Sequence, residues 1–208
     1  VALAMWLAGA VRSLGCVASW VVEHSQGEMA AAEVSGALSW EERAKIIALR
    51  SQFVKNRLAG LGGMAVVEMP VEAVSKRLEE AGLALSIAVV NTPTSTVVSG
   101  DADAIEQFVL SFAEEDTFCR RVDVDYASHS AHVDSILTEY RQQIAMIEPK
   151  PTSVPMISTV TGEFIDGEAL GADYWCSNLR ETVRFDRALD VLLAQGHGVF
   201  IEVSPHPV

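Results

Sequence analysis

Residues 18–32 read ASWVVEHSQGEMAAA and join an apolar, β-branched segment to a segment of small residues and helix formers. Ser25 stands at the junction, and Gly27 follows two positions later. This pattern predicts a nucleophile elbow, a tight strand-to-helix turn that exposes a Ser oxygen and points the first helical N–H groups at whatever the Ser attacks. The usual motif is Gly-x-Ser-x-Gly, and Glu23 occupies its first Gly position here. The alternative interpretation is a surface Ser that caps a helix.

Composition favours a globular protein and excludes several functions. The chain has 208 residues, of which 50% are hydrophobic and 21% charged, enough for one large or two small domains. Its net charge of −13 and the absence of a basic face argue against a nucleic-acid partner. The cysteines are scattered, without a CxxC pair, at Cys16, Cys119 and Cys176. They indicate neither a disulfide framework nor a zinc site, so we expect reduced thiols and no metal.

The chain opens on the apolar run VALAMWLAGAV at residues 1–11. No basic residue precedes this run, and it is too short to span a bilayer, so we predict a buried helix and no membrane partner. The chain lacks an initial Met and ends in a Pro-rich phrase. We therefore expect a piece of a longer protein, and the reduced thiols favour a cytoplasmic one.

Two regions have different patterns of predicted elements. Residues 63–124 follow the order β-α-β-β-α-β, which predicts a ferredoxin-like small subdomain. Its expected strands are 64–69, 84–91, 96–99 and 120–124, and its expected helices are 71–81 and 101–115. Residues 1–62 and 125–208 should form a larger α/β subdomain around it. The elements expected there are helices 1–14, 26–34, 39–58, 129–147, 174–179 and 183–194, and strands 18–23, 154–159 and a buried 199–203.

A Ser nucleophile needs a base, and the chain offers five candidates: His24, His129, His132, His197 and His206. His129 lies where the chain returns from the small subdomain, so it could face the elbow across a cleft; the alternative is a helix-capping or core His. Arg50 lies on an otherwise apolar helix. It is either a surface residue with a packed stem or a cleft residue that holds a carboxylate bidentately.

With these residues in place, the chain resembles the acyltransferase domain of a modular type I polyketide synthase. The resemblance covers nearly the whole chain. The phrases that carry it, in order, are VEHSQGE at 22–28, ALRS at 48–51, NTP at 91–93, VVSGD at 97–101, YASHS at 126–130, YW at 174–175, NLR at 178–180 and EVSPHP at 202–207.

The resemblance implies an α/β-hydrolase-like large subdomain, a ferredoxin-like small one and an active site between them. It implies that Ser25 is the nucleophile and His129 the base. Arg50 would hold the free carboxylate of an extender unit, and the backbone N–H of Gln26 would be an oxyanion donor. Asn178 matches a position whose backbone carbonyl orients the catalytic His.

The resemblance also implies a substrate and partners. Tyr126, Ala127 and Ser128 before the His, with Gln26 after the Ser, mark methylmalonyl-CoA selectivity in this family, and His24 is a further substrate-binding position. The acyl group would pass through an acyl-Ser ester to the phosphopantetheine thiol of an acyl carrier protein. No cofactor is implied. Neighbouring ketosynthase and linker domains of the parent synthase are further expected partners.

The sequence also departs from the family. The family's N-terminal strand and its Gly-Gln-Gly loop, which supplies a second oxyanion donor, are missing, and Glu23 would crowd the elbow. Both features are expected to lower activity. Thr182 replaces a common Pro, which we expect to be benign. Two other hypotheses stay open: an α/β-hydrolase-like esterase or thioesterase that uses Ser25 and His129, and a non-catalytic structural remnant.

Overall fold

The structure, a computed structural model, describes residues 2–203, and the side chains from Trp6 onward. The helices are α1 (Ala2–Ser13), α2 (Glu28–Val34), α3 (Trp40–Phe53), α4 (Val71–Ala81), α5 (Ala102–Leu110), α6 (Asp134–Gln143), α7 (Ala172–Arg180) and α8 (Phe185–Ala194). Short 3₁₀ turns lie at Ser25–Gly27, Ala131–Val133 and Gly167–Ala169, and a π-helical segment, Val54–Leu58, extends α3. The strands are β1 (Val21–Val22), β2 (Gly63–Val67), β3 (Ser86–Thr92), β4 (Ser95–Gly100), β5 (Cys119–Arg121), β6 (Met156–Ser158), β7 (Glu163–Ile165) and β8 (Val183–Arg184).

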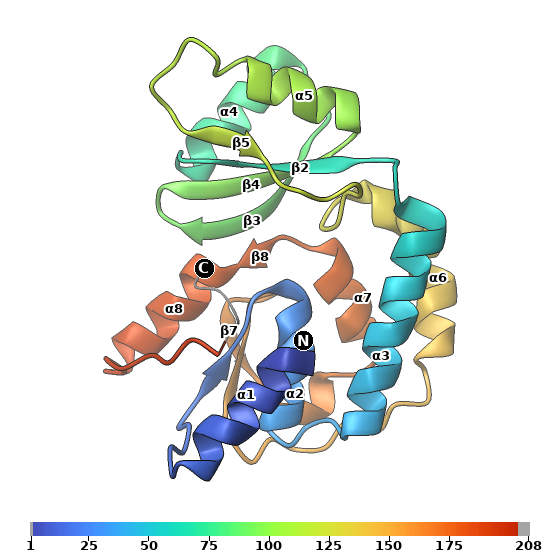
Figure 1. The fold of residues 1–208 in the computed structure, drawn as a ribbon, viewed down its shortest axis with the longest axis vertical. Helices are drawn as coiled ribbons and strands as arrows, with labels where there is room; N and C mark the ends of the chain where they lie inside the picture. The colour runs from blue at the N-terminus through green and yellow to red at the C-terminus, as the bar shows by residue number, and fades with distance from the viewer. Residues whose placement is uncertain (1, 204–208) are drawn as a thin grey trace.

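The small sheet has the strand order β5-β2-β4-β3-β8. Among its first four strands each pairs with its neighbour in antiparallel fashion, and the chain joins them in the order β-α-β-β-α-β, so the predicted ferredoxin-like arrangement is confirmed. Helices α4 and α5 cover one face of this sheet (Figure 1). The buried core between them contains Val67, Val74, Leu78, Val98, Ile105, Phe108 and Phe112. Helix α4 ends at Gly82 with φ +64°, a left-handed conformation that Gly adopts without strain.

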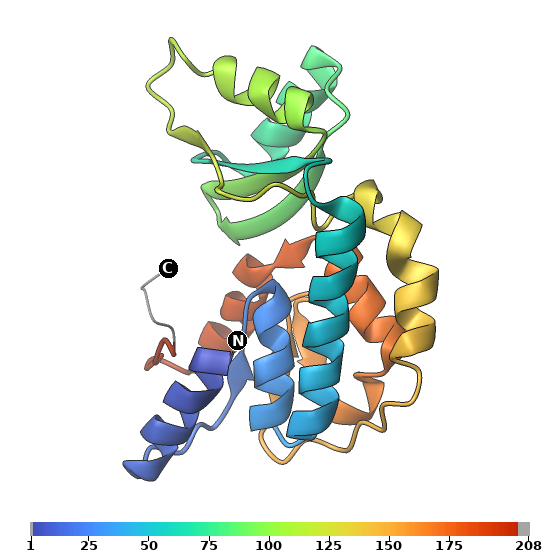
Figure 2. The same ribbon diagram turned by 45° about the vertical axis from the view of Figure 1, so that its right-hand side comes forward.

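The large part contains a sheet of order β1-β6-β7, in which β1 and β6 are parallel. Helices α1, α2 and α3 lie beside one another along this part of the molecule, and α6 and α7 pack beyond α3 (Figure 2). A large buried core joins these elements and contains Met29, Ile46, Phe53, Ile136, Tyr140, Met156, Trp175 and Leu179. Within the described part of the chain, no helix combines the length and apolar character needed to cross a membrane.

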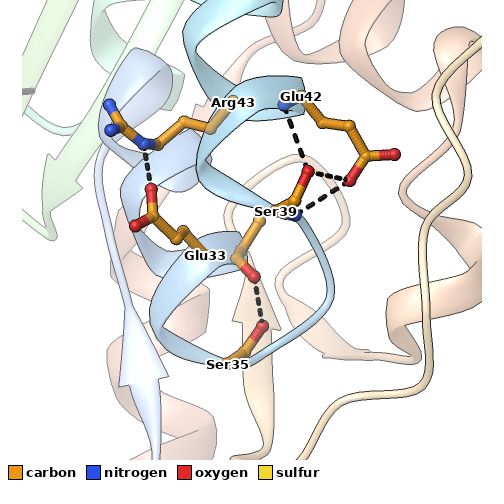
Figure 3. A network of polar contacts seen from close by, with 6 residues as sticks. Glu33, Ser35, Ser39, Glu42 and Arg43 are labelled. Atoms are coloured by element: carbon orange, nitrogen blue, oxygen red, sulfur yellow. Dashed lines mark hydrogen bonds and ion pairs between the residues drawn. The ribbon is translucent and has the colours of Figure 1, made fainter.

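Helix α3 begins with a capping box (Figure 3). Ser39 Oγ accepts from the backbone N–H of Glu42, and the Glu42 carboxylate accepts from the backbone N–H of Ser39. The same carboxylate accepts the N–H of Glu148 at 2.7 Å. Arg43, in the next turn, pairs with Glu33 of α2. These contacts fix the start of α3 relative to α2, and so the direction in which the rest of α3 runs.

Several predicted elements are wrong in type, extent or burial. The N-terminal run forms a helix, α1, as expected, but the helix is not buried, since Trp6 is 69% exposed. Residues 199–203 form no strand, and Val199 is 86% exposed although the pattern predicted a buried strand. The run has strand propensity, but no described strand pairs with it. The helix expected over 129–147 begins only after an extended turn, at Ala131–Val133 and then α6. Strand β7 was not predicted, and β8 replaces the first turn of the helix expected over 183–194.

Candidate active site

Ser25 sits in the strand-to-helix turn that the sequence predicts. Strand β1 ends at Val22, Ser25 opens a 3₁₀ turn, and α2 begins at Glu28. Ser25 has φ +52°, a left-handed conformation that is costly for a residue with a side chain. A strained Ser between strand and helix is the mark of a nucleophile elbow. The surface N-cap interpretation is wrong, because Ser25 opens a 3₁₀ turn in place of an N-cap and its hydroxyl contacts a distant His.

His129 is the partner of that hydroxyl. Its Nε2 lies 2.7 Å from Ser25 Oγ. Its Nδ1 lies 2.8 Å from the backbone carbonyl of Glu181. A carbonyl can only accept, so Nδ1 carries the proton and Nε2 is the free acceptor that faces the Ser hydroxyl. His129 also has a positive φ, +56°, and its backbone N–H donates to the carbonyl of Leu179.

The surroundings keep His129 neutral. Burial lowers the pKa of His129 to about 3, and the nearby positive charge of Arg50 acts in the same direction. The hydrogen bond to the carbonyl of Glu181 opposes this fall in pKa. A neutral imidazole at physiological pH can take the proton of a hydroxyl. The pair therefore has the geometry and the protonation state of a nucleophile and its base.

Arg50 points into the same site. Its side chain is 7% exposed, so the surface interpretation is wrong. Nη1 donates to Asn178 Oδ1 at 2.8 Å, and Nη2 lies 3.4 Å from Ser25 Oγ. Burial lowers the pKa of Arg50 from its ordinary value. A guanidinium in this position can bind an anionic group held next to the Ser hydroxyl.

Asn178 reaches the site by its side chain, which corrects the expectation for this residue. The carbonyl that orients His129 belongs to Glu181, one residue beyond the end of α7. Asn178 Nδ2 donates to the backbone carbonyl of Ser25 at 3.0 Å and to Glu28 Oε2 at 2.7 Å. The Asn178 amide therefore connects the elbow, Arg50 and a buried carboxylate.

That carboxylate, Glu28, is a site residue that the sequence analysis missed. Glu28 is fully buried in the first turn of α2. It accepts from Thr159, Tyr174 and Asn178. Burial raises the pKa of Glu28, and these hydrogen bonds oppose the rise. A Glu three residues after the Ser, directly before the apolar run MAAA, was the available signal.

The other predicted residues surround the centre without touching Ser25 Oγ. Gln26 directly follows Ser25 at the start of the 3₁₀ turn and is exposed. Its N–H belongs to the first turn, where donors have no partner within the helix. Tyr126 is half-buried, packs on the large core and lies close enough to Arg50 to affect its pKa. Ser128 is turned away, because its hydroxyl contacts Met64 Sδ at 3.5 Å.

The remaining histidines lie away from the hydroxyl. His24 Nε2 lies 2.9 Å from Asn91 Oδ1 on β3, and its ring packs beside Phe185. Burial lowers the pKa of His24. His132 pairs with Asp101. The ring of His197 packs against Trp20. His206 lies outside the described residues.

Glu23 is accommodated beside Gly27. Its carboxylate accepts the backbone N–H of His24 at 3.1 Å. A Cβ added at Gly27 would collide with Glu23 Oε2, so this side chain fills the space that Gly27 leaves open. Burial raises the pKa of Glu23, and the hydrogen bond from His24 opposes the rise. Glu23 is therefore half-buried and hydrogen-bonded.

Metal-binding groups do not gather in the described part of the chain, where no cluster of three or more His, Cys, Asp or Glu residues could hold an ion. The chemistry on view is that of an elbow Ser bonded to a neutral His, with helical N–H donors beside it. This is the arrangement of enzymes that form acyl-serine intermediates.

Comparison with known proteins gives the class of this domain. A family profile described as "Acyl transferase domain" matches residues 1–208. Polyketide synthase GfsB of Streptomyces halstedii is 50% identical over 198 residues, which cover 95% of this chain and 4% of that protein. Erythronolide synthase EryA2 of Saccharopolyspora erythraea is 46% identical over 197 residues, 95% of this chain and 6% of that protein. This chain thus spans a small part of these relatives.

A solved structure agrees with these matches. The acyltransferase domain from module 8 of the salinomycin polyketide synthase superposes with a TM-score of 0.96 at 45% identity, covering 100% of this chain and 49% of that one. The chain belongs to the acyl transferase domain family. The fold predicted from the sequence, a large α/β part with an inserted ferredoxin-like part, is that of this family.

Proposed function

We propose that this domain loads a methylmalonyl unit from CoA onto the phosphopantetheine thiol of an acyl carrier protein. The observation that carries the proposal is the meeting of three groups: Ser25 Oγ lies 2.7 Å from His129 Nε2 and 3.4 Å from Arg50 Nη2. Relatives and solved neighbours from polyketide synthases support the reaction class.

The reaction would run in two half-reactions. His129 Nε2 takes the proton of Ser25, whose oxygen attacks the thioester carbonyl, and the N–H of Gln26 stabilises the oxyanion. The intermediate collapses, the CoA thiolate leaves with the proton from His129, and an acyl-Ser ester remains. The carrier thiol then gives its proton to His129 and attacks this ester, which returns Ser25 to its free form.

Arg50 would select acyl groups that carry a carboxylate. Its guanidinium is buried, so a carboxylate that binds it meets little competing water and the attraction between the charges is strong. A neutral acyl group would leave this charge without a counterion. The same feature disfavours a hydrolase function, because an esterase has no use for a buried cation beside its nucleophile.

The preference for methylmalonyl rests on Gln26 and on Tyr126 with Ser128, the positions that mark this selectivity in the resemblance. One methyl group is worth only about 1–3 kcal/mol of discrimination, so malonyl-CoA should react more slowly and still react. We also propose the division into residues 1–62 with 125–208 and residues 63–124, a cytoplasmic location, and neighbouring ketosynthase and linker domains as contacts in a parent synthase.

Intact-protein mass spectrometry after brief incubation with methylmalonyl-CoA tests the proposal. We expect one added methylmalonyl mass, a smaller yield from malonyl-CoA, and no adduct in Ser25→Ala. A folded protein that gains no mass, or an adduct that persists in Ser25→Ala, would contradict it.

A catalytically impaired remnant is the second candidate function. The observation in its favour is Glu23, a half-buried carboxylate at the first Gly position of the elbow motif. Glu23→Gly separates the two candidates, because it removes the carboxylate and keeps the nucleophile. Acylation that appears only in Glu23→Gly would favour the remnant, whereas equal acylation in both proteins would reject it.

A further inference from the structure

We propose that Glu28 is a positioning residue, whose buried carboxylate fixes the amide of Asn178 and thereby holds Arg50 over Ser25. Glu28 itself does not touch the Ser hydroxyl, so its effect has to pass through Asn178. This inference rests on the roles proposed above for Ser25 and Arg50.

Glu28 is surrounded by hydrogen-bond donors. Its Oε1 accepts from the backbone N–H and from the hydroxyl of Thr159. Its Oε2 accepts from the Tyr174 hydroxyl at 2.6 Å and from Asn178 Nδ2 at 2.7 Å. An ionised carboxylate has about four acceptor positions and no donor. The four contacts match this capacity, so Glu28 presents only acceptors to its surroundings.

This polarity determines how the Asn178 amide points. The acceptor face of Glu28 requires the Nδ2 donor, and the backbone carbonyl of Ser25 requires the same group. The amide oxygen is left to face Arg50 Nη1, where it accepts at 2.8 Å. If the amide turned over, Nδ2 would face the guanidinium, and two donors would meet.

The arrangement also balances charge. Arg50 and Glu28 are both buried, and the negative charge of Glu28 raises the pKa of Arg50, opposing the effect of burial. The Asn178 amide lies between them, so the two groups are linked through hydrogen bonds without forming a direct ion pair. One face of Arg50 therefore stays available to a second anion, the acyl carboxylate.

Glu28→Gln tests the inference with a change of one group. The backbone N–H of Thr159 requires an oxygen, so the new NH₂ group would face Asn178 Nδ2. Asn178 then has to turn its own donor toward Arg50, which displaces the guanidinium. The readout is kcat/KM for methylmalonyl-CoA divided by kcat/KM for propionyl-CoA, which lacks the carboxylate. We expect this ratio to fall about tenfold or more, the usual effect of losing a hydrogen bond to a charged group.

A merely structural role predicts a different result. Partial unfolding would lower both rates by the same factor and leave the ratio unchanged, and that outcome would overturn the inference. Glu168→Gln, at an exposed position, is the matched control and should keep the wild-type ratio. Tyr174→Phe removes another donor from Glu28 but keeps the contact with Asn178. It should lower stability with less than about a twofold change in ratio; a fall as large as that of Glu28→Gln would also overturn the inference.

A second variant keeps the inference testable if Glu28→Gln fails to fold. Asn178→Ala removes the oxygen that accepts from Arg50 Nη1 and leaves Glu28 in place. We expect the ratio to fall in this variant as well, whereas an unchanged ratio in folded Asn178→Ala would overturn the inference. Ser25→Ala separates this result from failure of the proposed function. Acylation that persists without Ser25 contradicts the function, and acylation that needs Ser25 with an unchanged ratio in Glu28→Gln contradicts only the positioning role.

Discussion

The two sheets of this molecule differ in regularity and in what they contribute to the site. The small sheet is built from antiparallel neighbours and has its own core under α4 and α5. The sheet of the large part has three short strands, yet the groups around Ser25 Oγ come from the large part. Among the described residues, the non-Gly residues with positive φ are Ser25 and His129. Regular structure thus supports the site, and strained turns form it.

The sharpest form of this contrast is between two serines. Ser25→Ala removes the strained hydroxyl and should lower the rate of acyl transfer at least about 10³-fold, as loss of a nucleophile does. Ser99→Ala changes a fully buried Ser on β4, whose hydroxyl finds no partner among the described residues. Its loss should leave the rate unchanged and raise stability by up to about 1 kcal/mol, because an unpaired polar group is removed. Carrier-loading assays measure the rate of acyl transfer and urea unfolding measures the stability of the two variants. A reduced rate in Ser99→Ala would contradict the prediction.

Two phenylalanines sharpen the comparison of the cores. Phe108 is fully buried under the small sheet, whereas Phe53 lies in the large core one turn after Arg50 and packs on Tyr140. Either Phe→Ala change should cost about 3–5 kcal/mol of stability. We expect only Phe53→Ala to lower the acylation rate of the folded fraction as well, because it frees the turn that carries Arg50. Thermal unfolding and acylation measured well below both Tm values check this, and an equal loss of rate in the two variants would contradict it.

The buried base also predicts a pH dependence of stability. His129 has a pKa of about 3 in the folded chain, below its ordinary 6.5, so the unfolded chain binds more protons between these values. This residue should therefore make stability fall as the pH drops below 6.5, by up to about 1.4 kcal/mol per pH unit. His129→Gln removes this contribution. Urea unfolding of both proteins at pH 7 and pH 5 measures it, and parallel losses in the two proteins would contradict the prediction.

The smallest effect is expected at Thr182, between the two sheets. Glu181 has φ −82° and ψ 161°, the extended conformation that a residue before Pro favours. Thr182→Pro loses one hydrogen bond, from Oγ1 to the carbonyl of Ile87 at 2.7 Å, but stiffens the unfolded chain. The two effects nearly cancel, so we expect a change within about 1 kcal/mol. A shift of Tm by more than a few degrees would show that the connection between the sheets is more sensitive than this.

Sequence patterns predicted the small sheet better than the large one. The strands of the small sheet show alternating apolar and polar residues or an apolar run over several residues, and Gly82 marks the end of α4. Strand β7 of the large part has three residues, too few for a period to show, and the one strand of the small sheet that was not predicted, β8, has only two. The apolar run at 199–203 has the composition of a buried strand, but composition does not supply the neighbouring strand that a β-ladder needs.

Within the site, the motif and the resemblance predicted the groups that touch Ser25 Oγ, His129 and Arg50. The resemblance assigned the orienting carbonyl to Asn178, and the fold shows that Glu181, three residues later, provides it. Glu28 was missed for a related reason. Its partners Thr159, Tyr174 and Asn178 lie more than 130 positions away in the chain.

The two-residue strand β8 has a mechanical consequence. It joins the small sheet beside β3, and it begins two residues after Glu181, whose carbonyl holds His129 in register with Ser25. The carbonyl that orients His129 and the strand that pairs with β3 therefore belong to one short segment, so the base is attached through its Nδ1 contact to the edge of the small sheet.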